Sequence, residues 1–166
     1  MKKEHLPMIG VGPIYVISII LLTIVGIYIS EIGLIDLGKI SLLTIPFAFM
    51  GAVLIIFGII FWLKAVFQSK LSDNIKKNTL VTTGVYSYVR NPIYSAFLMI
   101  CTGALLFANN LILLILPVIY WIYLTLLMKF TEEKWLKNLY GNEYTEYCKR
   151  VNRCIPFLQK MKEELI

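Results

Sequence analysis

The chain has 166 residues, of which 58% are hydrophobic and only 16% are charged, and its mean hydropathy is +0.76. Because a soluble domain carries about 25% charged residues, this composition excludes an ordinary soluble protein and indicates an integral membrane protein. The formal net charge of +6 requires no nucleic acid as partner, since membrane topology and attraction to anionic lipid account for it.

Four apolar runs are candidate membrane spans, and all four should be helices. They cover about residues 14–29, 40–67, 93–108 and 111–128. A span needs about 20 residues to cross a hydrocarbon core of about 30 Å, so the third run is short and the second is long enough to tilt or kink. Pro46 and Pro117 fall within two of these runs, where we expect neighbouring groups to satisfy the carbonyls that a proline leaves free.

The distribution of basic residues predicts how the spans are oriented. Lys39 is the only basic residue between the first two spans, and the Asn109-Asn110 link between the last two has none. The other fifteen of the sixteen lysines and arginines lie at the N-terminus, between residues 64 and 90, or after Met128. Because cytoplasmic loops carry the excess of basic residues, both termini and the loop between spans two and three should face the cytoplasm. No small-residue cleavage site follows the first span, so we expect it to stay as an anchor.

Cysteine and histidine usage argues against disulfides and metals. Cys101, Cys148 and Cys154 form no Cys-x-x-Cys pair, and the predicted topology leaves the last two in a reducing compartment. His5 is the only histidine, and no four-ligand zinc pattern exists, so we expect no metal site.

Two polar segments, residues 68–92 and 129–166, are both expected at the cytoplasmic end of the bundle, where they can meet. The first contains a helix start at Asn91-Pro92, because asparagine caps helices and proline suits the first helical position. The free amides of that start, with the guanidinium of Arg90 beside them, favour an anionic group such as a carboxylate or phosphate. Flat apolar surface with a polar tip comes from three nearby tyrosines, Tyr86, Tyr88 and Tyr94.

The second polar segment is expected to form two short helices. Residues 129–140 continue from the fourth span, Gly141 is a stop signal, and Asn142 can cap the next helix. One apolar or aromatic face follows from the spacing of Leu136, Tyr140, Tyr144, Tyr147 and Val151. Taken alone, this pattern indicates an amphipathic pair of helices lying on the membrane surface.

Glu132 and Glu133 lie within one turn of the end of the fourth span, where a carboxylate is costly unless it is hydrated or paired. Two interpretations stay open. The glutamates pair with Lys129 or Lys137 on the same helix, worth ~0.2–0.5 kcal/mol per pair, or one of them binds a cation inside a pocket. A cation site beside the anion site at Arg90 would suit a zwitterionic amino acid attached to a flat ring, of which S-adenosylmethionine is an example.

The two polar segments also resemble a known family. The stretch NTLVTTGVYSYVRNPIY, an apolar hairpin and then EEKWLKNLYGNEYTEYCKRVNRCIP are similar to the isoprenylcysteine carboxyl methyltransferases, which are integral membrane enzymes. Related phospholipid methyltransferases share this architecture. The resemblance covers roughly residues 68–157 and implies an S-adenosylmethionine-dependent methyltransferase acting on a lipid-like acceptor, such as the α-carboxylate of a prenylcysteine.

The expected fold is therefore an all-α integral membrane protein with four transmembrane helices in a single membrane domain. Residues 1–67 supply the two N-terminal spans, and residues 68–157 form the methyltransferase core with spans three and four. A cytoplasmic loop and the C-terminal amphipathic helices should cap the cofactor site, with the cofactor arriving from the cytoplasm and the acceptor from the bilayer.

The resemblance implies a set of cofactor-binding residues in this sequence. The family's glutamine before the loop is similar to Gln68. Its His-Thr-Leu-Val stretch corresponds to Asn78, Thr79, Leu80 and Val81, and its Gly-Val-Tyr tyrosine to Tyr86. Its Arg-His-Pro-x-Tyr motif corresponds to Arg90, Asn91, Pro92, Ile93 and Tyr94, where asparagine replaces histidine but can still donate a hydrogen bond. The glutamate that binds the amine of the cofactor is most like Glu132, and the family's Gly-x-x-Tyr-x-x-Tyr stretch is found at Gly141, Tyr144 and Tyr147.

The positions expected to contact the acceptor depart from the family. In its eukaryotic members, an arginine implicated in substrate binding lies four residues before the glutamate. That position is Met128 here, and the neighbouring Lys129 is not a bidentate clamp. Arg150 and Arg153 are further candidates for holding an acidic or phosphate group of the acceptor, with contact to lipid headgroups as the alternative.

Methyl transfer from a sulfonium asks chiefly for alignment and for exclusion of water. A carboxylate acceptor needs no general base, whereas an amine acceptor must first lose a proton, and Glu133 is the spare carboxylate expected nearby. The catalytic candidates are thus Arg90, Lys129 and Glu133.

Three other functions remain open at this point. Methylation of a phospholipid or another amine is the first. A small membrane transport or structural subunit should carry polar residues inside its spans, and those are sparse here. A membrane reductase would need a phosphate site for its nicotinamide cofactor, but Gly10-x-Gly12 is no dinucleotide fingerprint, because no strand precedes it and Pro13 follows it.

Overall fold

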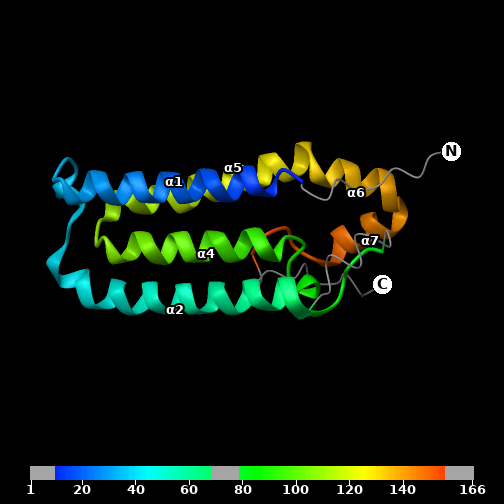
Figure 1. The fold of residues 1–166 in the computed structure, drawn as a ribbon, viewed down its shortest axis with the longest axis horizontal. Coiled ribbons are helices and arrows are strands. Elements are labelled where there is room, and N and C mark those ends of the chain that lie inside the picture. Colours follow the sequence, from blue (N-terminus) through cyan, green and yellow to red (C-terminus); the bar gives the residue numbers. More distant parts are fainter. Residues whose placement is uncertain (1–9, 69–78, 156–166) are drawn as a thin grey trace, which may run out of the picture.

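The computed structural model describes residues 10–68 and 79–155, and these residues fold into helices and short turns without a named strand (Figure 1). Four long helices form the bundle: α1 (Gly12–Glu31), α2 (Thr44–Leu63), α4 (Pro92–Phe107) and α5 (Ile115–Phe130). Two shorter helices follow, α6 (Glu132–Tyr140) and α7 (Asn142–Arg150).

Short turns complete the described chain. The 3₁₀ turns η1 (Asp36–Gly38), η2 (Ser41–Leu43) and η5 (Leu111–Leu114) lie at the end of the bundle away from α6 and α7. A π-helical turn, η3 (Lys64–Gln68), extends α2, and η4 (Gly84–Ser87) precedes α4.

Three helical stretches are long and apolar enough to cross a membrane, by length and composition: Gly12–Glu31, Ser41–Phe67 and Leu111–Tyr140. These agree with the first, second and fourth predicted spans. The third predicted span is α4, which has 16 residues and is therefore about 24 Å long. The expectation that this apolar helix is short is confirmed.

The two prolines were expected to interrupt spans two and four, and this expectation is wrong. Pro46 lies in the first turn of α2 and Pro117 in the first turn of α5. The first four amide groups of a helix have no intrahelical acceptor. A proline there removes no hydrogen bond from the helix, so no neighbouring group has to replace one.

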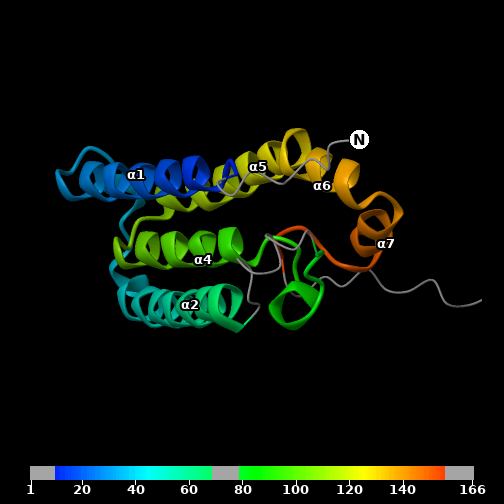
Figure 2. The same cartoon turned by 45° about the vertical axis from the view of Figure 1, so that its right-hand side comes forward.

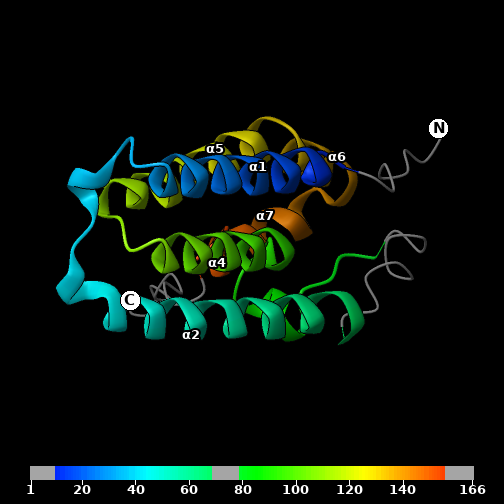
Figure 3. The same ribbon diagram turned by 60° about the vertical axis from the view of Figure 1, so that its left-hand side comes forward.

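Helix α4 lies between α2 on one side and the pair α1 and α5 on the other in all three views (Figures 1, 2 and 3). Glycines bring α2 and α4 together. A Cβ atom on Gly51 would lie 2.7 Å from the carbonyl oxygen of Gly103, and one on Gly103 would lie 2.6 Å from that of Gly51. Such close backbone contact is typical of packed helices in membranes.

The core between α1, α4 and α5 is apolar, with a small polar contact inside it. Its fully buried side chains include Tyr15, Ile19, Leu105, Tyr120, Leu124 and Met128. The hydroxyl groups of Thr23 and Tyr120 lie 3.0 Å apart and satisfy each other between the helices. Other faces of the long helices expose leucine, isoleucine and phenylalanine side chains, as expected for surfaces that contact lipid.

The chain after α7 is bonded to the segment that leads into α4. The amide of Arg90 donates to the carbonyl of Asn152 at 2.9 Å, and Ser95 Oγ donates to the carbonyl of Cys154 at 2.8 Å. From α7 itself, the Tyr147 hydroxyl donates to the carbonyl of Tyr86 at 2.5 Å. The two polar segments therefore meet at one end of the bundle, as the sequence suggested.

Two of the expected helix caps differ from the structure. Asn91 occupies the N-cap position of α4, but its side chain donates to the carbonyl of Arg153 instead of capping the helix. Gly141 ends α6 with a φ of +55°, as predicted, and also precedes α7, so Asn142 is the first residue of α7 and not its cap. A positive φ favours glycine, which explains the sharp turn there.

Candidate functional site

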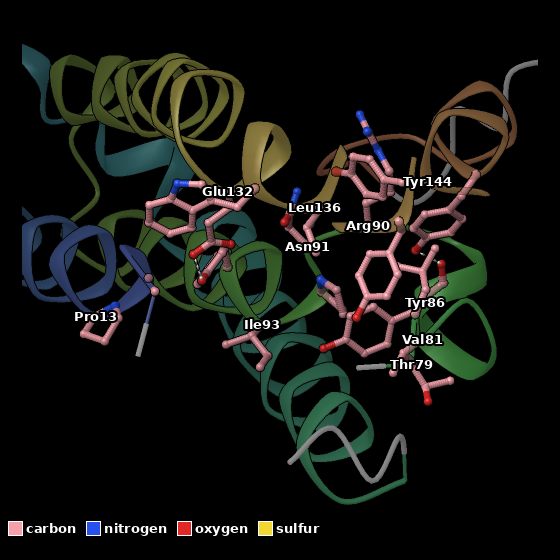
Figure 4. A pocket seen from close by; sticks show the side chains of 18 of the residues that line it. Pro13, Thr79, Val81, Tyr86, Arg90, Asn91, Ile93, Glu132, Leu136 and Tyr144 are labelled. Carbon is pink, nitrogen blue, oxygen red and sulfur yellow. Dashed lines mark hydrogen bonds between the residues drawn. The ribbon is translucent and has the colours of Figure 1, made fainter. Parts of the chain in front are cut away.

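A pocket of about 470 Å³ lies at the end of the bundle where the two polar segments meet (Figure 4). Its walls come from the starts of α1 and α4, from residues 79–81, from η4, and from α6 and α7. This volume is within the ~300–1,000 Å³ range of small-molecule sites. The fold therefore brings segments from both ends of the sequence around one cavity.

Most residues predicted to bind the cofactor line this pocket. They are Thr79, Leu80, Val81, Tyr86, Arg90, Asn91, Pro92, Ile93, Tyr94 and Glu132. Asn78 and the side chain of Gln68 lie outside the part of the chain that the structure describes. The sequence motif thus corresponds to one continuous surface in space.

Glu132 is the acidic side chain among the described residues of the pocket wall. Its Oε1 accepts a hydrogen bond of 2.9 Å from the Tyr94 hydroxyl. The start of α1 lies directly against this carboxylate, since a Cβ atom on Gly10 would lie 2.5 Å from Glu132 Oε1. The Tyr94 hydroxyl of α4 thus orients the carboxylate beside the start of α1, where it can bind a cation.

Arg90 reaches the pocket from a cluster of three charged side chains. Its Nη2 lies 3.1 Å from Glu133 Oε1. Arg153 pairs with the same carboxylate through both oxygens, with Nε 2.6 Å from Oε1 and Nη2 2.9 Å from Oε2. Two guanidinium groups thus share one carboxylate, which leaves one positive charge in excess.

The Arg90 side chain is only 9% exposed, and its Nε has no hydrogen-bond partner among the described residues. A second nitrogen, Nη1, contacts Cys148 Sγ, and the guanidinium carbon lies 6.0 Å from the centroid of the Tyr144 ring. A buried donor without a partner is costly. Together with the excess positive charge, it makes this wall of the pocket suitable for an anion.

The apolar face of α6 and α7 is used inside the protein. Tyr144, Tyr147 and Val151 are buried together, and Leu80 from the first polar segment packs against them with Leu136 and Tyr140. Burial raises the pKa of the Tyr144 and Tyr147 phenols, so both remain protonated. The interpretation of these helices as a pair lying on the membrane surface does not explain this packing.

The pocket wall lacks five of the predicted catalytic and acceptor residues, namely Met128, Lys129, Glu133, Arg150 and Arg153. Met128 is fully buried in the core with Tyr15 and Leu124, while Lys129 and Arg150 are exposed. Arg153 is engaged by Glu133. Tyr88, whose ring was expected near the anion site, is 53% exposed and also lies away from the pocket wall.

Sequence reasoning missed several lining residues. They are Gly10, Gly12, Pro13, Val16 and Trp135. Trp135 lies three residues after Glu132 on the same helix, so helical spacing could have identified it. The α1 residues carry no such signal, because the contact of α1 with α4 and α6 is not local in sequence.

The three cysteines are free thiols in the structure. Burial raises the pKa of Cys154 to about 12, which makes this thiol a poor nucleophile. Among residues 10–68 and 79–155, no three His, Cys, Asp or Glu side chains come together in a way that could hold a metal ion. The chemistry of the pocket therefore rests on Glu132, Arg90 and the tyrosines.

Several known proteins are similar to this chain over about half of its length. Protein-S-isoprenylcysteine O-methyltransferase B of Arabidopsis thaliana is 35% identical over 80 residues, which is 48% of this chain and 40% of the relative. The Saccharomyces cerevisiae enzyme named protein-S-isoprenylcysteine O-methyltransferase is 38% identical over 90 residues (54% and 36%). The Mus musculus protein of that name is 33% identical over 106 residues (60% and 34%).

The chain spans two fifths or less of the length of these three relatives. No solved structure matches it significantly. The resemblance to the isoprenylcysteine carboxyl methyltransferases is nevertheless confirmed by the relatives, and a family model described as phospholipid methyltransferase matches residues 46–143. Because this match covers more than half of the 166 residues, the chain belongs to the phospholipid methyltransferase family.

Proposed function

We propose that this protein is an S-adenosylmethionine-dependent methyltransferase of the membrane, with a lipid-like acceptor such as the α-carboxylate of a prenylcysteine. One observation carries the proposal. One pocket is lined by a carboxylate, an arginine and an aromatic wall, and the family resemblance assigns cofactor binding to most of these positions. The three features match the three parts of the donor: its ammonium, its carboxylate and its adenine.

The residues of the pocket fit this donor. Glu132 would accept from the ammonium, and Arg90 with the start of α4 would hold the carboxylate. The orphaned Nε of Arg90 supports this assignment, because an anion would satisfy it. The tyrosine-rich wall of Tyr86, Tyr144 and Tyr147 suits a flat adenine ring. The bound sulfonium supplies an already activated methyl group, so the chain has to orient the reactants and exclude water.

A carboxylate acceptor fits the site better than an amine. An amine has to lose its proton before it can attack, and Glu133 was the expected base. Here both oxygens of Glu133 accept from Arg153 and one also pairs with Arg90. A carboxylate paired with two guanidinium groups is a weak base, whereas the excess positive charge would attract an anionic acceptor.

An acceptor with an apolar tail would reach the pocket from the bilayer. Pro13 and Val16 from α1 and Ile93 from α4 line the pocket, and Figure 4 shows Pro13 on the far side of Glu132 from Tyr86 and Tyr144, with Ile93 below Glu132. These side chains offer no hydrogen bonds and suit a prenyl chain. The relatives are named as protein-S-isoprenylcysteine O-methyltransferases, and these names support the same acceptor class.

We further propose that α4 crosses the bilayer as a fourth, short span and that the pocket faces the cytoplasm. Fifteen of the sixteen lysines and arginines fall in sequence segments that are expected to be cytoplasmic, which supports this orientation. A donor dissolved in the cytoplasm and an acceptor dissolved in lipid would then meet at the same cavity.

Calorimetric titration of the detergent-purified protein with S-adenosylhomocysteine, the demethylated product, tests the donor site. We expect saturable binding that Glu132→Ala abolishes without unfolding the protein. Glu31→Ala, at the opposite end of α1, is the matched control and should bind normally. A folded wild-type protein that gives a flat titration with and without a prenylcysteine analogue would refute the proposed donor.

Methyl transfer then identifies the acceptor. Labelled S-adenosylmethionine is supplied with either a prenylcysteine analogue or phosphatidylethanolamine. Base-labile label in the prenylcysteine would establish carboxyl methylation. Label only in phosphatidylethanolamine would instead assign amine methylation and contradict the role proposed for Glu133.

A further inference from the structure

The stretch Gly10-Val11-Gly12 at the start of α1 lies directly against the side chains that form the cation site. A Cβ atom on Gly10 would lie 2.5 Å from Glu132 Oε1, and one on Gly12 would lie 2.6 Å from Cζ of Tyr94. Any side chain at either position would overlap these groups. The two glycines thus permit a close approach, and a larger residue at either position would displace the Glu132 carboxylate or the Tyr94 ring.

This approach brings the backbone amides at the start of α1 next to the Glu132 carboxylate. The amides of Val11 and Gly12 lie near the carboxylate, and these amides belong to the helix start, where N–H groups have no acceptor within the helix. The positive end of the α1 dipole also favours a negative charge at this point. The start of α1 therefore stabilises the ionised form of Glu132 and limits the directions in which its oxygens can point.

Three helices meet at this one carboxylate. Glu132 is the first residue of α6, Tyr94 donates from α4, and the amides come from α1. Figure 4 shows Glu132 between Pro13 of α1 and the start of α4. Without α1, only the Tyr94 hydroxyl among these donors would orient the carboxylate.

We propose that Gly10 and Gly12 are positioning residues of the donor site, which let the start of α1 fix the carboxylate that receives the donor's ammonium. This inference rests on the proposed function, because it concerns the same site. It extends the site from the second half of the chain to a segment outside both the family motifs and the matched residues 46–143.

The test compares Gly12→Ala with Gly26→Ala. Both change a glycine of α1, but a Cβ on Gly26 would meet Leu116 Cδ1 at 3.0 Å, far from the pocket. Each variant is titrated with S-adenosylhomocysteine and with methylthioadenosine, which lacks the amino-acid part. Gly12→Ala should weaken the binding of S-adenosylhomocysteine by about tenfold or more, because a charge-assisted contact is lost. It should leave the affinity for methylthioadenosine within about twofold of the wild-type value. Gly26→Ala should leave both within about twofold.

A double variant separates positioning from general damage. If Gly12 acts through Glu132, Gly12→Ala should add no further loss to Glu132→Gln. Should Gly12→Ala fail to fold, Gly10→Ala is measured in the same way, with the same expected pattern.

Each possible outcome decides the inference. Equal weakening of both ligands by a folded Gly12→Ala would mean that the pocket wall is merely deformed, and unchanged binding of both would mean that α1 is not needed. Either result overturns the inference while leaving the proposed donor intact, provided that Glu132→Ala still abolishes binding. If the wild-type protein binds neither ligand, the proposed function fails and the inference fails with it.

Discussion

Glu132 and Glu133 are neighbours in the sequence, yet they have different surroundings. Consecutive residues of a helix point about 100° apart, so Glu132 faces the pocket while Glu133 faces Arg90 and Arg153. Sequence reasoning left open whether these glutamates pair with lysines or bind a cation. The structure pairs Glu133 with arginines, which come from segments 43 and 20 residues away and could not be inferred from helical spacing.

Replacing Glu133 should therefore affect stability. Glu133→Gln would leave two largely buried guanidinium groups without their shared carboxylate, and we expect the free energy of unfolding to fall by about 2–4 kcal/mol. Denaturant titration in detergent measures this change. Glu146→Gln, which removes the exposed ion pair with Lys149, is the control and should have no measurable effect. A stable Glu133→Gln protein that loses methyl transfer to an amine would instead make Glu133 the base.

The long helices are where sequence and structure agree best. Hydropathy located the four apolar helices to within a few residues, because each helix is apolar over most of its surface. The pairing of the helices was not predicted, since it depends on glycines that the pattern of hydropathy does not distinguish. Gly51 and Gly103 lie about fifty residues apart and become neighbours only when α2 packs on α4.

Gly103→Ala tests this glycine contact. The added methyl group would meet the backbone oxygen of Gly51 at 2.6 Å, and a backbone atom cannot rotate away, so α2 and α4 would have to separate. We expect the free energy of unfolding to fall by about 1–3 kcal/mol.

The same substitution at Gly26 provides the comparison. Its Cβ would meet only the flexible ends of leucine side chains, with Leu116 Cδ1 at 3.0 Å and Leu113 Cδ2 at 3.3 Å, so the loss should stay below about 0.5 kcal/mol. Equal losses at Gly103 and Gly26 would contradict the close packing of α2 against α4.

Among the described residues, the pocket and the Arg90–Glu133–Arg153 cluster both lie at one end of the bundle. The motif residues before α4 were predicted to bind one ligand, and they do share one pocket with Glu132. The contribution of α1 was missed because the family resemblance covers only the second half of the chain. The opposite end is closed by the short turns η1, η2 and η5, where Asn110 donates to Ser30 Oγ and to the carbonyl of Ile35, both at 2.9 Å.

Because the pocket and the short turns lie at opposite ends of the bundle, the orientation of the protein in the membrane can be tested. Leu37 is 99% exposed at the end away from the pocket, and Lys149 is exposed near the pocket. If the basic end is cytoplasmic, a membrane-impermeant maleimide should label Leu37→Cys in intact cells and Lys149→Cys only after permeabilisation. The wild-type protein corrects for labelling of the native cysteines. The reverse pattern would place the pocket outside the cytoplasm, where a cytoplasmic donor could not reach it, so orientation and proposed function depend on each other.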